Sequence, residues 1–208
     1  MSKILKDFDR LYINKIPSKP KLKENYKGNL KLENKSLMKK GLYNGTILGC
    51  VDYTKEGNDI ILNCQELKFF DILLNRIERT PKLANVDIVI ETKDKYILMI
   101  KRGGNVATYK YYFDFPAGLI PQGIKPYSRA VNRIKEDTGI EKKFIKLNKE
   151  PSYLMLKGKS AGLFYLAKCK LTKKELEKFL GNKFVDKKIL FLKKSEIKNF
   201  LIDQKKVY

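Results

Sequence analysis

The fold is decided by the stretch Asp114-Phe-Pro-Ala-Gly118-Leu-Ile-Pro-Gln-Gly123-Ile-Lys-Pro-Tyr-Ser-Arg-Ala-Val-Asn132-Arg133-Ile-Lys-Glu136-Asp137-Thr-Gly139-Ile140. Its first part, residues 116–123, is rich in glycine and proline and predicts a loop. Pro126 suits the first turn of a helix and Gly139 suits its end, so the spacing predicts a helix over 126–138. A glycine-containing loop that leads into a helix forms a concave site where backbone N–H groups and carboxylates meet.

Three charged residues late on this helix indicate opposing chemistries. Glu136 and Asp137 are placed to hold a hard cation against a phosphate. Arg133 precedes them by three and four residues, so all three side chains share one helical face and the guanidinium competes for both carboxylates. The alternative is an ordinary acidic helix face that pairs with Arg133 and Lys135 and binds nothing.

This stretch resembles the Nudix box, in which a glycine is followed by five residues, a glutamate, seven residues and then Arg-Glu-aliphatic-any-Glu-Glu-any-Gly-aliphatic. The matching residues are Gly118, Ile134, Glu136, Gly139 and Ile140, and Asp137 is a conservative match. The opening Phe-Pro-Ala-Gly-Leu-Ile is especially similar to the ADP-ribose pyrophosphatase branch. The resemblance covers roughly residues 84–205. It implies an α/β fold, an α/β/α sandwich with a mixed β-sheet, and a nucleoside-diphosphate-linked ligand such as ADP-ribose or a sugar nucleotide.

Several box residues depart from the pattern. Ile124 stands in place of the first glutamate, Asn132 in place of the arginine and Arg133 in place of the next glutamate. The loop 156–162 also lacks the glutamate that the ADP-ribose branch tends to supply after the box. What remains from the resemblance is Glu136 and Asp137 as catalytic residues and weak Mg²⁺ ligands. We therefore expect pyrophosphate hydrolysis to be weak, altered or lost.

Phosphate binding is predicted for Arg102, Gly118 and Arg133. Arg102 follows an expected strand at the presumed cleft, although a plain surface arginine is equally compatible with its position. Arg133 is suited to clamp a diphosphate directly and so to replace the charge of a metal, the alternative being a solvent-facing salt bridge. Gly118 gives the loop its backbone freedom.

Two further hypotheses remain open. One is an active Mg²⁺-dependent pyrophosphohydrolase that recruits carboxylates outside the box, for which Asp114 and Glu150 are the nearest candidates. The other is a non-catalytic protein that associates with nucleic acid or serves as a scaffold. It is suggested by the formal net charge of +22, because basic surfaces favour phosphate partners. Nearly all of this charge is lysine spread along the chain, which makes specific nucleic-acid recognition the weaker reading.

Three regions are expected along the chain. Residues 1–41 form a basic, extended or partly disordered N-terminal arm, residues 42–80 a lead-in β-hairpin and helix, and residues 81–208 the Nudix-like domain. Helices are predicted over 66–77, 126–138, 173–180 and 195–202. Strands are predicted over 45–53, 59–65, 84–91, 95–101, 109–115, 144–147, 153–156, 161–168 and 189–192.

Composition limits the chemistry further. The 208 residues include no histidine, which excludes imidazole ligands and Ser-His-Asp or Cys-His catalysis. The three cysteines, Cys50, Cys64 and Cys169, are odd in number and far apart in sequence, so they predict neither a disulfide framework nor a zinc motif. The longest apolar runs are too short for a bilayer and no secretory signal is seen, so we expect a cytoplasmic protein without a membrane partner. A homodimer is compatible with the sequence.

Overall fold

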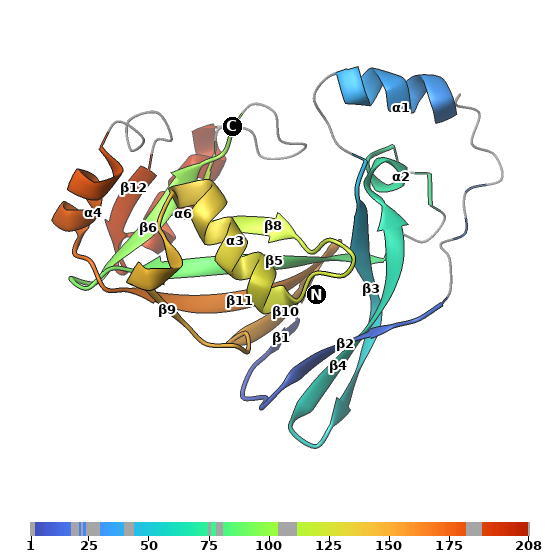
Figure 1. The fold of residues 1–208 in the computed structure, drawn as a ribbon, viewed down its shortest axis with the longest axis horizontal. Coiled ribbons are helices and arrows are strands. Elements are labelled where there is room, and N and C mark those ends of the chain that lie inside the picture. The colour runs from blue at the N-terminus through green and yellow to red at the C-terminus, as the bar shows by residue number, and fades with distance from the viewer. Residues whose placement is uncertain are drawn as a thin grey trace. The chain divides into compact units, whose positions relative to one another are not determined.

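The structure is a computed structural model that describes residues 3–17, 21, 23, 30–39, 44–74, 76–77, 81–103, 112–181 and 189–207. The chain forms two compact units (Figure 1). Unit 1 comprises residues 1–85, 119–125 and 152–163, and unit 2 comprises residues 86–118, 126–151 and 164–208. Strands β5 (Lys82–Glu91), β8 (Ala117–Leu119) and β11 (Ser160–Cys169) contribute residues to both units.

Unit 1 is built around a long antiparallel hairpin. Its elements are β1 (Lys3–Leu5), β2 (Leu11–Lys15), α1 (Leu30–Lys39), β3 (Thr46–Glu56), β4 (Asp59–Lys68), α2 (Phe69–Leu73) and β10 (Tyr153–Lys157). Strands β3 and β4 pair along their whole length, and Gly57 takes a positive φ of 59° in the turn between them. Strand β2 pairs with β4 in parallel, and β1 pairs with β10 in antiparallel orientation.

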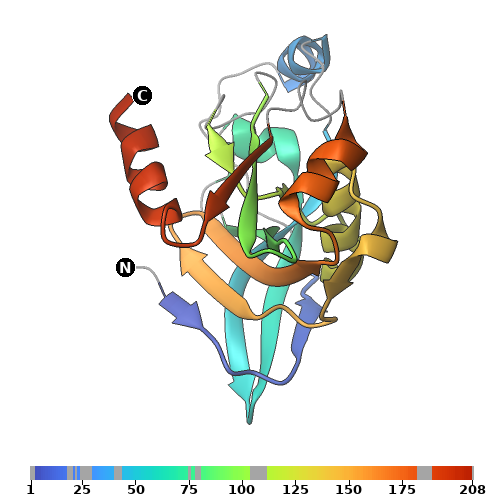
Figure 2. The same ribbon diagram turned by 90° about the vertical axis from the view of Figure 1, so that its left-hand side faces the viewer.

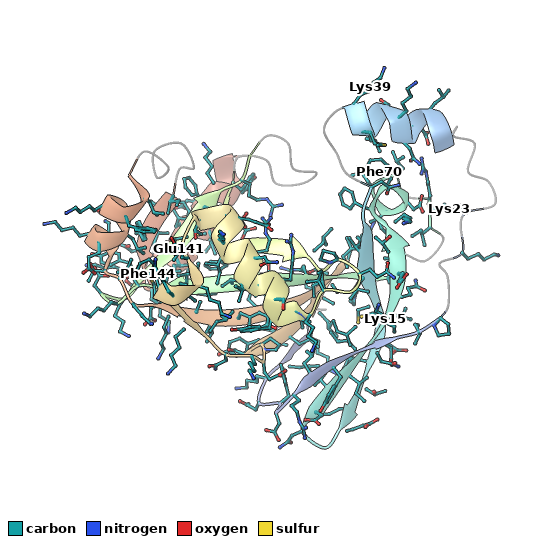
Figure 3. All side chains as sticks on the ribbon, viewed as in Figure 1. Lys15, Lys23, Lys39, Phe70, Glu141 and Phe144 are labelled. Atoms are coloured by element: carbon teal, nitrogen blue, oxygen red, sulfur yellow. The ribbon has the colours of Figure 1, made fainter. Side chains whose placement is uncertain are left out.

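One hydrophobic cluster of unit 1 includes residues from both strands of this hairpin. Ile47, Leu67 and Ile77 are buried together, and the partly buried residues packed against them are Phe69, Ile72, Leu83 and Leu119. The buried Arg76 donates hydrogen bonds to Asp71 on α2 and to Glu33 on α1, at 3.0 and 2.8 Å. In Figure 3 the buried Phe70 lies on α2, and the exposed Lys39 lies at the end of α1.

Unit 2 is an α/β layer structure. Its elements besides β5 and β11 are β6 (Tyr96–Lys101), β7 (Phe113–Asp114), β8 (Ala117–Leu119), α3 (Pro126–Thr138), the 3-10 turn η1 (Lys142–Phe144), β9 (Ile145–Leu147), α4 (Lys173–Leu180), β12 (Ile189–Lys193) and α6 (Ile197–Val207). Strand β6 pairs antiparallel with β12, β5 and β7, and β9 pairs antiparallel with β11. Figure 2 shows α6 on one side of these strands and α3 and α4 on the other. The predicted α/β class with a mixed sheet is confirmed, since β2 pairs in parallel with β4 while the other pairs named above are antiparallel.

Other predictions need correction. The predicted N-terminal arm contains the extended strands β1 and β2, which pair at sheet edges, and also the helix α1, which was not predicted. The helix predicted over 66–77 is wrong in its bounds, since the alternation of buried and exposed side chains carries β4 on to Lys68 and α2 ends at Leu73.

The other differences concern the segments before α3. The predicted loop over 116–123 contains the short strand β8, which pairs with β5. Of the strand predicted over 109–115, residues 109–111 lie outside the described part of the chain. None of the described helices is long and apolar enough to cross a membrane.

Candidate functional site

Helix α3 separates an apolar face from a charged face. Ala130, Ile134 and Thr138 are buried on the first. The adjoining face carries Arg129, Arg133, Glu136 and Asp137, which we call the α3 charge cluster. Their spacing of three, four and seven residues places them on one side of the helix. The predicted helix bounds of 126–138 are confirmed, and so is the shared face of Arg133 with the two carboxylates.

Strand β8 brings a glycine against this cluster. A Cβ atom at Gly118 would lie 2.8 Å from Arg133 Cδ and 2.9 Å from both Arg133 Nε and Arg129 Nη2. Any side chain at this position would therefore displace the two guanidinium groups. Gly118 has a packing role here: it lets both arginines lie directly over the backbone of β8.

The two arginines bind both carboxylates of the cluster. Arg133 Nη1 lies 3.0 Å from Glu136 Oε2, and Arg133 Nη2 lies 2.6 Å from Asp137 Oδ2. Arg129 Nη1 lies 3.3 Å from each carboxylate oxygen of Glu136. Two positive and two negative charges thus neutralise one another, and Arg133 bridges the two acids predicted to be metal ligands.

Burial differs within the cluster and decides which groups can exchange partners. The side chain of Asp137 is 12% exposed, whereas that of Glu136 is 49% exposed. Burial raises the pKa of Asp137, although the Arg133 guanidinium and the backbone N–H of Ala117 act in the opposite direction. Burial also lowers the pKa of Arg129, although the nearby Glu136 carboxylate opposes this shift. Glu136 is therefore the partner that an incoming anion can most easily replace.

One donor of the cluster lacks an acceptor that a bound anion could supply. Arg133 Nε is buried and has no hydrogen-bond acceptor among the described residues. A buried donor without an acceptor costs free energy, on the order of 1–3 kcal/mol. An oxygen of a bound anion that reaches this atom would satisfy it.

The described residues do not fit a magnesium ion. Mg²⁺ requires near-octahedral oxygen ligands, usually carboxylates together with waters and phosphate oxygens. No group of three potential ligand side chains gathers in the described part of the chain. Both carboxylates of the cluster already carry guanidinium partners, so a cation would have to displace Arg133 and overcome its charge.

The other residues predicted for the site have other partners. Arg102, after β6, pairs with Asp114 on β7 at 3.2 Å, and the N–H of Phe115 donates to the same carboxylate. Burial, and after it the Glu150 carboxylate, raise the pKa of Tyr165 on β11. Arg102 thus neutralises the Asp114 carboxylate, and Glu150 acts on Tyr165. The sequence prediction missed Arg129, although its spacing of four residues from Arg133 and seven from Glu136 is the signal that identifies it.

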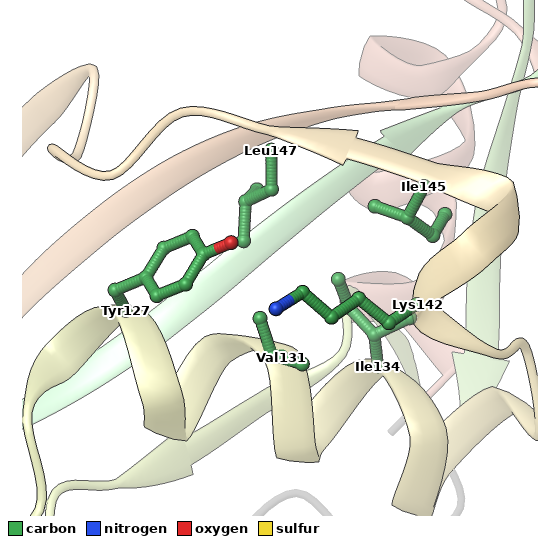
Figure 4. Close-up of a pocket in the computed structure, with 6 residues that line it drawn as sticks. All are labelled: Tyr127, Val131, Ile134, Lys142, Ile145 and Leu147. Atoms are coloured by element: carbon green, nitrogen blue, oxygen red, sulfur yellow. The ribbon is translucent and has the colours of Figure 1, made fainter.

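A small pocket lies beside the same helix, between α3 and the segment η1–β9 (Figure 4). It is lined by Tyr127, Val131, Ile134, Lys142, Ile145 and Leu147. The Lys142 ammonium lies 5.8 Å from the centre of the Tyr127 ring. Its largely apolar lining indicates packing of α3 against β9, so it adds no group to the charge cluster.

Comparisons with known proteins give likenesses in structure alone. No family model and no curated protein matches the sequence. Among solved structures, a Nudix-family hydrolase from Clostridium perfringens is 13% identical, with 57% of this chain and 85% of that chain covered and a TM-score of 0.39. An Ap4A hydrolase from C. elegans is 15% identical, with 43% and 69% covered and a TM-score of 0.33.

A third likeness is to a bifunctional NMN adenylyltransferase/ADP ribose pyrophosphatase from Francisella tularensis, complexed with AMP and a manganese ion. It is 14% identical, with 49% of this chain and 31% of that chain covered and a TM-score of 0.31. All three TM-scores are below 0.5, so the function of this chain rests on its own residues.

Proposed function

We propose that this chain is a Nudix-like protein that binds the diphosphate of a nucleoside-diphosphate-linked metabolite, of the ADP-ribose or sugar-nucleotide type. In this proposal Arg129 and Arg133 bind the phosphates, and pyrophosphate hydrolysis is slow or lost. The observation that carries the proposal is that Arg133 bridges Glu136 and Asp137. A guanidinium group thus stands where the Nudix family, which this chain resembles, places its metal.

Binding exchanges one carboxylate for another anion. Guanidinium groups form short, bidentate hydrogen bonds with phosphate as well as with carboxylate. The half-exposed Glu136 can turn to solvent, so that a phosphate takes its place on Arg129 and Arg133. The more buried Asp137 keeps Arg133 oriented, and Gly118 lets both guanidinium groups lie against the backbone of β8.

The same contacts explain why hydrolysis should be slow. Metal-assisted hydrolysis needs a cation that polarises the phosphate or lowers the pKa of a bound water. Here the carboxylates that would hold the cation or accept a proton are neutralised by arginine. The cluster is thus suited to holding a diphosphate and poorly suited to activating water.

Calorimetric titration with ADP-ribose and a panel of sugar nucleotides, in Mg²⁺ and in EDTA, tests this proposal. We expect equal affinity in both buffers and no product in the mixtures. Arg133→Gln should weaken binding by about tenfold or more, because it removes a guanidinium group that binds the phosphates. A tenfold change corresponds to about 1.4 kcal/mol. The matched control is Lys135→Gln, which removes the same charge from the same helix but not from the cluster.

A different result would favour the active hydrolase. If binding requires Mg²⁺ and the ligand is cleaved, and if Glu136→Gln abolishes cleavage, then Glu136 and Asp137 hold metal during turnover and the arginine-clamp proposal is wrong. If no nucleotide of the panel binds, the proposal is also wrong, and the hypothesis of a nucleic-acid-associated or scaffold protein takes its place.

A further inference from the structure

Two cysteines that are far apart in sequence face each other in unit 1. Strands β3 and β4 lie side by side in both views of the fold (Figures 1 and 2). In their antiparallel register Cys50 is the direct partner of Cys64. Both residues are buried, at 2% and 0% exposure. The hairpin thus forms the cysteine pair that sequence spacing did not predict.

The two thiols interact with each other, and Cys50 also has a backbone partner. A hydrogen bond between the thiols affects the pKa of both cysteines, and the Cys50 thiol donates a hydrogen bond to the backbone oxygen of Asp52 at 3.1 Å. The hydrogen bond from Cys64 lowers the pKa of Cys50, overcoming the opposite effect of burial. The pKa of Cys64 is raised, first by this hydrogen bond and then by burial.

The backbone geometry suits a cross-strand link. Directly opposed residues of antiparallel strands have Cα atoms about 4.5 or 5.5 Å apart, depending on the kind of pair. Disulfides span Cα separations of about 4.4–6.8 Å. The Cα separation of either kind of pair therefore lies within the range that a disulfide spans.

An irregularity next to Cys50 offers a route for small reagents. The register of β3 and β4 shifts between Cys50 and Asp52, which leaves Val51 as the extra residue of a β-bulge. Val51 is 50% exposed. Bulges interrupt the hydrogen-bond ladder, and local opening at this place would expose the neighbouring sulfur.

We propose that Cys50 and Cys64 form a redox modification site, at which a peroxide-class oxidant closes an intramolecular disulfide. The Cys50 thiolate attacks a peroxide oxygen, the O–O bond breaks and the hydroxide that leaves becomes water. Cys64 then attacks the sulfenic sulfur of Cys50, and the S–O bond breaks with release of a second water. Two thiols and one hydrogen peroxide thus give one disulfide and two waters.

Mass spectrometry of the folded full-length protein after hydrogen peroxide treatment tests the site. We expect the loss of two hydrogens, a single alkylatable thiol at Cys169 after denaturation, and one peptide pair that joins Cys50 to Cys64. Closing this hairpin should raise Tm by roughly 5–10 °C, and dithiothreitol should reverse the shift. Cys169→Ser should still form the link, whereas Cys50→Ser and Cys64→Ser should not.

Peptide mapping of the unsubstituted protein decides the matter even where a cysteine variant fails to fold. Three alkylatable thiols after oxidation would overturn the proposal. A link that involves Cys169, a link between two chains, or a Cys50 oxidised to sulfinic acid without a disulfide would overturn it as well. None of these outcomes depends on whether the chain binds nucleotides.

Discussion

Arginine 133 shows how one residue changes the chemistry of a helix. It stands where the resembling box has a glutamate, and its guanidinium bridges Glu136 and Asp137 at 3.0 and 2.6 Å. Replacing a carboxylate by a guanidinium alters the local charge by two units against a cation. The spacing of these residues made the competition predictable, because side chains three and four residues apart share a helical face.

Arg133→Glu should create a metal site. The substitution removes the competing cation and places a third carboxylate within one turn of Glu136 and Asp137. We expect Mn²⁺ or Mg²⁺ binding with a Kd on the order of 1 mM or tighter, measured by calorimetry or by the electron paramagnetic resonance signal of Mn²⁺. Lys135→Glu makes the same charge change beside the cluster and should not bind metal. Equal metal binding by both variants would contradict the prediction.

Gly118→Ala tests the packing of the arginines over β8. A Cβ atom there would lie 2.8–2.9 Å from atoms of Arg129 and Arg133, which must then move aside. We expect diphosphate affinity to fall by about tenfold, with little change in Tm because flexible side-chain ends can move at low cost. Gly103→Ala is the control, since a Cβ at Gly103 meets no atom within 4 Å. Unchanged affinity in Gly118→Ala would show that the ligand binds elsewhere.

Among the elements, helix α4 illustrates a start that the sequence encodes locally. Thr172 accepts a hydrogen bond from the N–H of Glu175, and the Glu175 carboxylate accepts one from the N–H of Thr172, at 2.7 Å. This is a capping box, and it fixes the first turn of the helix. Asp94, from the turn between β5 and β6, accepts a further hydrogen bond from the N–H of Lys173.

Acid should weaken this helix start. The backbone N–H and then the hydroxyl of Thr172 lower the pKa of Glu175 below its ordinary 4.5. Against burial, the Thr92 hydroxyl and the N–H of Lys173 lower the pKa of Asp94 below 3.8. A lowered folded-state pKa gives stability that is present above the ordinary value and is lost as pH falls through the folded value.

Urea denaturation at pH 7 and pH 3 measures this loss. We expect the free energy of unfolding to fall toward pH 3, and Glu175→Gln should reduce the difference between the two pH values. Glu177→Gln, two residues on and outside the capping box, should leave the difference as it is. The prediction fails if both variants show the same pH dependence as the unsubstituted protein.

At the scale of the whole molecule, the most prominent property is the excess of positive charge. The formal net charge is +22, from 45 basic and 23 acidic residues. Arg10, Arg76, Arg102, Arg129 and Arg133 all pair with carboxylates. Lysine therefore supplies most of the charge that faces outward, and lysine binds phosphate as a point charge without reading base edges.

We therefore expect nucleic acid to bind without sequence preference. The Kd should be in the range of about 10⁻⁴–10⁻⁶ M at physiological salt, and log K should fall linearly with log salt concentration. Fluorescence anisotropy with one labelled oligonucleotide and its scrambled version, at several salt concentrations, measures both properties. Nanomolar binding of one sequence but not of its scrambled version would contradict this expectation and favour the nucleic-acid hypothesis.

The sequence by itself determined the elements whose signals are local. The bounds of α3 follow from Pro126 and Gly139, and those of α4 from its capping box and Gly181. The strands of the β3–β4 hairpin follow from the turn at Gly57 and the alternation of apolar residues. The pairing of Arg133 with Glu136 and Asp137 was also predictable from the sequence, since helical spacing determines which side chains meet.

Only the tertiary structure decided the contacts between residues distant in sequence. The meeting of Gly118 with Arg129, the pairing of Arg102 with Asp114 and the contact of Cys50 with Cys64 depend on which strands and helices lie together. The paired β1 and β2 within the predicted arm have the same origin. Which strands pair depends on contacts between segments that are distant in sequence, and the local pattern of residues does not specify the partner strand.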